Sequence, residues 1–207
     1  MNKNIQAVLA QKLAKRQEKN NLRKLSLNFA EIDFFSNDYL GLASNSELEK
    51  NISQEYNSLT SRNGATGSRL LSGNSEYIVN LEQKLATIFK TEAALIFNTG
   101  FTANSSLISA ICQKGDTILY DELAHASLKE GMRLSFAKRF SFKHNDLADL
   151  ERKLIKAQGQ IFILVESLYS MDGDLAPIAQ LVVLAKKYGA NIILDEAHST
   201  GAYGEQG

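Results

Sequence analysis

Apolar residues follow two alternating patterns along this chain, one typical of buried strands and the other of helices. Short, nearly continuous apolar runs predict strands that are covered on both faces. These runs lie at 93–98, 116–121, 139–144, 160–167 and 191–195. Between them, apolar residues spaced three or four positions apart predict helices. The helical stretches lie at 75–89, 101–112, 124–135, 145–157 and 176–188.

Residues typical of helix ends support this division. Asn145 or Asp146 can cap the helix that follows, and Pro177 and Gly189 stand where a helix is expected to begin and to end. The alternation of strands and helices predicts an α/β domain with a mostly parallel sheet flanked by helices. In such sheets, ligands bind at the carboxyl ends of the strands.

The first part of the chain has a different pattern. Ile5, Val8, Leu9 and Leu13 mark one face of a helix. The segment is basic, but it lacks the apolar core and the cleavage site of a signal peptide. We therefore predict an N-terminal helical arm with a connecting segment over 1–45, and the start of the larger domain over 46–207.

Composition narrows the class of protein. Lysine plus arginine and aspartate plus glutamate number 23 each, so charge gives no case for binding nucleic acid or an acidic membrane. No apolar run approaches the roughly 20 residues of a membrane helix. The single cysteine, Cys112, excludes an internal disulfide, and its helical context favours a buried structural thiol over a reactive one. These features predict a cytoplasmic protein without a zinc site.

Polar residues follow the predicted strands. Thr99 and Gly100 stand between the run at 93–98 and a helix, where free N–H groups can hold a phosphate. The alternative is a plain strand-to-helix turn, since neither a dinucleotide fingerprint nor a Walker loop is present. Because the carboxyl ends of parallel strands meet at one edge, the polar ends form one candidate site.

Two of these ends carry candidate chemistry. His125 follows one strand near the start of a helix, although a surface or capping histidine is the alternative. Asp172 and Gly173 signal a turn, after which Asp174 could cap the next helix. Asp195 ends the last strand, and a carboxylate there can pair with the protonated nitrogen of a pyridine ring. A phosphate-binding helix start, a stacking ring and an aspartate are the parts of a pyridoxal phosphate site.

Six motifs together resemble one enzyme family, the α-oxoamine synthases, over nearly the whole chain. The motifs are FFSNDYLGLAS, GATGSRLLSGN, FNTGFTAN, DELAHASLKEG, ESLYSMDGDLAP and LDEAHSTGAYGEQG, in the family's order and spacing. The resemblance implies the large domain of the aspartate aminotransferase fold type I with pyridoxal 5'-phosphate as cofactor. It also implies condensation of an amino acid with an acyl-CoA or acyl-carrier-protein thioester, with loss of CO2.

The resemblance implies roles for individual residues. Gly100 and Phe101 would meet the cofactor through the backbone, and His125 would stack on its ring and contact substrate. Asp195 would pair with the ring nitrogen. Ser170 and His198 would lie around the ring hydroxyl, and Glu166 would help to order the hydrogen-bond network. Glu196 receives no catalytic role.

Two further residues would contact substrate. Arg23 aligns with an N-terminal arginine of the family, and an exposed helix arginine is the alternative. Asn37 is expected near the substrate entrance, and a turn asparagine is the alternative.

One departure from the family concerns its Schiff-base lysine, which the resemblance places about thirty residues beyond His198. The chain reaches only Gly207, so we expect an N-terminal portion of such an enzyme that is inactive alone and whose complete form is a homodimer. A non-catalytic partner subunit stays open as an alternative, although retention of His125, Asp195 and His198 argues against it.

Overall fold

The computed structural model describes residues 4–25, 32–59 and 64–205. Two compact units divide the chain, Met1–Asn37 and Asp38–Gly207. The first unit contains α1 (Ile5–Glu18), which begins where the Asn4 side chain accepts a hydrogen bond from the N–H of Gln6 at 3.0 Å. The predicted arm helix is thus present, and none of its residues is buried. Within the described residues, no helix combines the length and apolar character that crossing a membrane requires.

Short helices precede the sheet in the second unit. They are η1 (Leu42–Ser44), α2 (Ser46–Ser58), the π-helical turn η2 (Arg69–Gly73) and α3 (Glu76–Ile88). Asn45 and Ser75 cap α2 and α3, because their side chains accept hydrogen bonds from N–H groups of the first turn.

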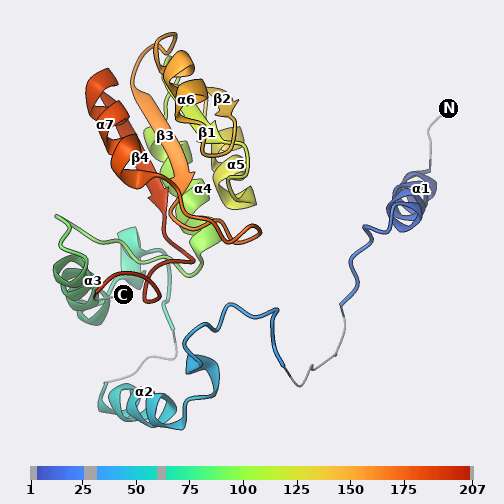
Figure 1. The fold of residues 1–207 in the computed structure, drawn as a ribbon. Coiled ribbons are helices and arrows are strands. Elements are labelled where there is room, and N and C mark those ends of the chain that lie inside the picture. The colour runs from blue at the N-terminus through green and yellow to red at the C-terminus, as the bar shows by residue number, and fades with distance from the viewer. Residues whose placement is uncertain (1–3, 26–31, 60–63, 206–207) are drawn as a thin grey trace. The chain divides into compact units, whose positions relative to one another are not determined.

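Four parallel strands form the sheet in the order β2-β1-β3-β4 (Figure 1). They are β1 (Thr117–Asp121), β2 (Lys138–Phe142), β3 (Ile161–Glu166) and β4 (Ala190–Asp195). In the register of β3 with β4, Glu166 lies opposite Asp195. Parallel pairing therefore brings Asp121, Glu166 and Asp195, the last residues of three strands, to one edge of the sheet.

Four helices cover the two faces of the sheet (Figure 1). They are α4 (Gly100–Ile111), α5 (Ala126–Leu134), α6 (Leu147–Leu154) and α7 (Ile178–Tyr188). The first of them precedes β1, and the other three connect successive strands. On one face, α4 and α5 bury side chains such as Ile108 and Leu128 against the sheet. On the other, α6 and α7 bury Leu150 and Leu181. The doubly covered parallel sheet predicted from the sequence is confirmed.

The predicted strand at 93–98 is wrong. These residues lie outside the sheet, and Leu95 is 65% exposed. The N–H of Ile96 donates instead to the Glu82 carboxylate at 2.8 Å, a carboxylate that also binds Arg69. An apolar run becomes a strand only where a neighbouring strand offers backbone partners, and none pairs with this segment in the described part of the chain.

Two smaller predictions also need correction. β4 is not fully buried: Ile193 is buried, but Ile192 and Leu194 are half-buried, because β3 is the only strand paired with β4 among the described residues. Asp174 does not cap α7, which begins after Pro177 without a side-chain cap. Its carboxylate binds His144 and Asn145 instead.

Candidate functional site

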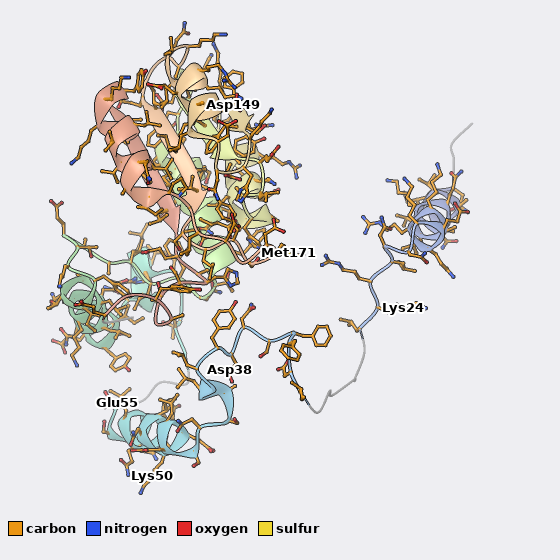
Figure 2. All side chains as sticks on the ribbon, viewed as in Figure 1. Lys24, Asp38, Lys50, Glu55, Asp149 and Met171 are labelled. Atoms are coloured by element: carbon orange, nitrogen blue, oxygen red, sulfur yellow. The ribbon has the colours of Figure 1, made fainter. Side chains whose placement is uncertain are left out.

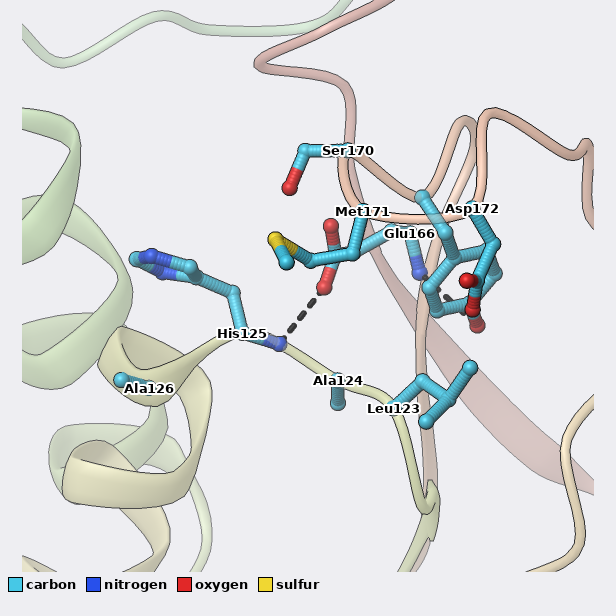
Figure 3. A pocket seen from close by; sticks show the side chains of 9 residues that line it. Leu123, Ala124, His125, Ala126, Glu166, Ser170, Met171 and Asp172 are labelled. Atoms are coloured by element: carbon cyan, nitrogen blue, oxygen red, sulfur yellow. Dashed lines mark hydrogen bonds between the residues drawn. The ribbon is translucent and has the colours of Figure 1, made fainter. Parts of the chain in front are cut away.

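A hollow of about 220 Å³ lies at the carboxyl edge of the sheet (Figure 3). Its walls come from the segment that leads into α5 and from the end of β3 with the loop that follows. The lining residues are Leu123, Ala124, His125, Ala126, Glu166, Tyr169, Ser170, Met171 and Asp172. The fold thus brings together His125, Glu166 and Ser170, three of the residues that the sequence singled out.

The hollow is held together by a bond between its two walls. His125 is the N-cap of α5, and its backbone N–H donates to Oε1 of Glu166 at 2.5 Å (Figure 3). The loop after β3 carries Ser170 and Met171 past this pair. Met171, on this loop (Figure 2), lines the hollow and is 91% exposed.

Glu166 has an altered acidity. Burial raises the pKa of its carboxyl group to about 7, and the charges of Asp195 and Asp121 act in the same direction. The hydrogen bond from His125 opposes this shift without cancelling it. A carboxyl group with this pKa changes its proton occupancy near neutral pH, as acid–base groups of active sites do.

A chain of hydrogen bonds connects Asp195 to His125. The Nδ2 atom of Asn104 on α4 lies 2.7 Å from Oδ2 of Asp195 and 3.0 Å from Oγ of Ser127 on α5. The same Oγ lies 2.7 Å from Nδ1 of His125. The other oxygen of Asp195 accepts a bond from the N–H of Ala197 at 2.9 Å. Helices α4 and α5 thus couple two of the predicted site residues.

The first turn of α4 begins at the predicted Thr-Gly turn. Thr99 caps the helix by accepting a hydrogen bond from the N–H of Thr102 at 3.0 Å. A methyl group added at Gly100 would meet no atom within 4 Å, so open space adjoins this turn. Phe101 is half exposed in the same turn. Asn104, which binds Asp195, lies one helical turn after Gly100. The free N–H groups of the first turn and the hydrogen bond to Asp195 therefore belong to the same helix, α4.

His198 lies in the turn after β4. Its Nδ1 atom is 2.7 Å from the hydroxyl oxygen of Tyr39, and the two rings are tilted with centroids 6.1 Å apart. The turn is fixed to β3 because the hydroxyl groups of Ser167 and Ser199 lie 2.6 Å apart. Glu196 is exposed.

Arg23 and Asn37 belong to the first compact unit, Met1–Asn37. His125 and Asp195 belong to the second unit. The roles of Arg23 and Asn37 toward substrate stay predictions.

A second histidine network lies outside the hollow. Nδ1 of His144 is 2.9 Å from Oδ1 of Asp121, and its Nε2 is 2.7 Å from Oδ2 of Asp174. Asn145 donates to both carboxylates, from its N–H to Asp121 and from Nδ2 to Asp174. Tyr169, which lines the hollow, packs its ring edge-on against His144 with centroids 4.5 Å apart. This network therefore fixes the loop after β3 from behind.

The sequence interpretation missed Asn104, Ser127, Tyr39 and His144. Asn104 and Ser127 have a readable signal, because each lies within the first turns of a helix that starts at a candidate site residue. Tyr39 and His144 have no such signal, since their partners are 159 and 30 positions away in sequence.

Comparisons with known proteins identify the family of this chain. Residues 30–207 match the family described as aminotransferase class I and II. A putative 8-amino-7-oxononanoate synthase of Bacillus licheniformis is 43% identical over 202 residues, which are 96% of this chain and 53% of that protein.

Solved structures have the same fold. The serine palmitoyltransferase of Sphingomonas wittichii superposes with a TM-score of 0.80 at 30% identity, over 96% of this chain and 53% of that one. A serine palmitoyltransferase of S. paucimobilis with bound PLP–myriocin aldimine gives 0.78 at 27% identity, over 95% and 55%.

The fold is the large-domain fold of the fold-type-I enzymes, as the sequence predicted. The chain belongs to the aminotransferase class I and II family. It resembles the α-oxoamine synthases within that family, which confirms the resemblance drawn from its motifs. The chain spans about half the length of the curated relatives it matches.

Proposed function

We propose that this chain provides the pyridoxal 5'-phosphate site of an acyltransferase that joins an amino acid to an acyl thioester with decarboxylation. The observation that carries the proposal is Asp195, a carboxylate held on both oxygens at the end of β4 and connected to His125. A carboxylate fixed in this way suits a protonated pyridine nitrogen, because it stabilises the charged form of the ring.

The residues around Asp195 fit the rest of the cofactor. Open space adjoins Gly100 at the start of α4, where N–H groups can bind a phosphate. His125 offers an exposed aromatic ring, and Ser170 and His198 offer polar groups at the same edge of the sheet. We assign the phosphate to Gly100 and Phe101, ring stacking to His125, the ring nitrogen to Asp195, and the ring hydroxyl to Ser170 and His198.

Pyridoxal phosphate, when bound, supplies an electron sink for a carbanion at the amino-acid α-carbon. The protein's own residues would then orient the bound cofactor and set the electrostatic environment around it. Asp195 would bind the pyridine nitrogen and favour its protonated form. Glu166 accepts the N–H of His125 and fixes the start of α5. Arg23 and Asn37 are proposed to contact substrate, and the complete protein is proposed to be a homodimer.

The substrates are proposed from the relatives' names. The relative from B. licheniformis is named a putative 8-amino-7-oxononanoate synthase, which favours L-alanine and a pimeloyl thioester as substrates and a place in biotin synthesis. The likeness to serine palmitoyltransferases keeps other α-oxoamine synthases as the second candidate, including 2-amino-3-ketobutyrate CoA ligase.

The test assays a protein that carries this chain together with the region its relatives have beyond it. Pimeloyl, acetyl and succinyl thioesters are each offered with L-alanine and with glycine, and release of the thiol carrier is measured. We expect release with pimeloyl thioester and L-alanine. Preference for another pair would identify another α-oxoamine synthase, and no release with any pair would favour a non-catalytic partner.

The 207-residue chain alone is expected to bind pyridoxal phosphate without turnover. No lysine lines the hollow within the described residues, and the ammonium group of Lys129 is occupied by the carbonyl of Glu122 at 2.8 Å. Borohydride should therefore trap no adduct at a single lysine of this chain. Such an adduct, together with release of the thiol, would contradict this expectation.

A further inference from the structure

The amide of Asn104 has only one orientation that satisfies its neighbours. A carboxylate accepts hydrogen bonds and donates none, so the NH2 side of the amide must face Asp195. The same nitrogen lies 3.0 Å from Oγ of Ser127, so its two N–H bonds serve Asp195 and Ser127. The carboxylate thus fixes the direction of the next hydrogen bond in the chain.

The hydroxyl of Ser127 therefore acts as an acceptor toward Asn104. Its own proton is free to point at Nδ1 of His125, 2.7 Å away. The backbone N–H of Ser127 also points at Nδ1, at 3.2 Å. Nδ1 faces two donors, and a nitrogen that accepts hydrogen bonds carries no proton. The neutral ring must then carry its proton on Nε2.

The opposite tautomer leaves donors facing one another. A proton on Nδ1 would point at the Ser127 hydroxyl and crowd the N–H of the same residue. The hydroxyl would accept from both Asn104 and His125, and its own proton would lose its partner. Ser127 is 1% exposed, so a lost hydrogen bond there is not replaced readily by bulk water.

We propose that Asn104 and Ser127 are positioning residues that couple Asp195 to His125 and hold the neutral imidazole as the Nε2–H tautomer. We call this chain of hydrogen bonds, from Asp195 through Asn104 and Ser127 to His125, the relay. Its role toward a ligand rests on the proposed function. Within the described residues Nε2 has no hydrogen-bond partner, so its N–H is available to an acceptor atom of a ligand in the hollow. One hydrogen-bond chain would then orient both the carboxylate and the stacking ring.

The tautomer can be measured by nitrogen NMR on the 207-residue chain labelled at its histidines, at pH 8 and without ligand. We expect a pyridine-type signal for Nδ1 of His125 and a pyrrole-type signal for Nε2. In Ser127→Ala the ratio of the Nδ1–H form to the Nε2–H form should rise by roughly fivefold, the factor for one hydrogen bond of about 1 kcal/mol. Asn104→Ala should raise the ratio in the same direction.

Ser109→Ala is the matched control. Its hydroxyl donates to the carbonyl of Ser106 within α4, so the variant loses a serine hydrogen bond of the same helix without touching the relay. The ratio should stay unchanged. A wild-type ring with its proton on Nδ1 would overturn the proposal, and this spectrum needs no variant to fold. An unchanged ratio in either Ser127→Ala or Asn104→Ala would also overturn it.

Pyridoxal phosphate titration of the same samples separates this proposal from the proposed function. Binding with the wrong tautomer would overturn the relay alone. The expected tautomer and variant responses without binding would support the relay and contradict the proposed function.

Discussion

Two histidines at the same edge of one sheet have opposite surroundings. His125 accepts at Nδ1 from Ser127 and leaves Nε2 without a partner in the described part of the chain. His144 has a carboxylate on each ring nitrogen, Asp121 on one side and Asp174 on the other. The first ring adjoins the hollow, whereas the second lies behind the loop that forms a wall of the hollow.

The difference shows how chemistry and support are divided at this edge. A ring bound by charges at both nitrogens has no atom left for a ligand, so His144 is suited to hold the fold. A ring that is hydrogen-bonded at only one nitrogen, such as that of His125, has its second nitrogen available to a ligand. Tyr169 connects the two regions, because it lines the hollow and packs edge-on against His144. Predictions that separate reaction from stability therefore test this comparison.

The largest expected effect is on the reaction. In the complete protein, Asp195→Asn should lower kcat by about 10²–10³-fold, the usual cost of losing one preorganised electrostatic group. The adjacent Glu196→Gln removes the same charge from an exposed position and is the matched control. Steady-state rates of both variants test this. Equal losses in the two variants would contradict the role of Asp195.

The next effect is on stability. At pH 6, below the raised pKa of His144, His144→Ala leaves Asp121, which is completely buried, without its protonated histidine partner, so we expect a loss of about 3 kcal/mol in the free energy of unfolding. His125→Ala removes mainly a helix cap and should cost about 1 kcal/mol. Urea unfolding of the chain, followed by circular dichroism, measures both. A larger loss in His125→Ala would invert the comparison.

The two regions should also differ in their response to pH. Glu166, with a pKa raised from 4.5 to about 7, binds more protons in the folded than in the unfolded chain between these values. Stability from this group therefore falls as pH rises from about 5 to 7. Burial acts to lower the pKa of His144, but its bonds to Asp121 and Asp174 and their charges outweigh burial and raise it. Its contribution is present below 6.5 and is lost as pH rises through the higher folded pKa.

The variant Glu166→Gln separates the two contributions. The amide oxygen of the substituted side chain would still accept the His125 N–H but would carry no charge, so the variant and the wild type should be similar at pH 5. At pH 8 the variant should be more stable by about 2–3 kcal/mol, since a pKa unit corresponds to about 1.4 kcal/mol. Urea unfolding at both pH values checks this. A difference of the same size at pH 5 would exclude titration of Glu166 as its cause.

The sequence was a good guide to local features of both regions. Periodicity predicted α1, α3, the four helices that flank the sheet and the four observed strands, because the spacing of apolar residues shows which side of an element is covered. It did not predict α2. The strand ends predicted the site edge, because parallel strands align their carboxyl ends. The predictions that failed, or that could not be made, depended on contacts between segments far apart in sequence. Residues 93–98 are as apolar as a strand but lack a neighbour among the described residues, and the contacts of His144 join segments that no local pattern relates.

The smallest expected effect tests whether the His125 network depends on close packing of α4 and α5. Gly131 on α5 faces α4 so closely that an added methyl carbon would lie 2.9 Å from Cβ of Ile108 and 3.0 Å from Cα of Ser105. Gly131→Ala should push the helices apart and cost about 1–2 kcal/mol in urea unfolding.

The Asn104–Ser127 bond should lengthen in this variant, so the tautomer ratio of His125 should change in the same direction as in Ser127→Ala. The NMR signals of His144 should stay in place, because its partners come from β1 and the loop after β3. Gly64→Ala is the control, since an added methyl there meets no atom within 4 Å. If His144 shifted as much as His125, the two networks would be one unit and the contrast between them would fail.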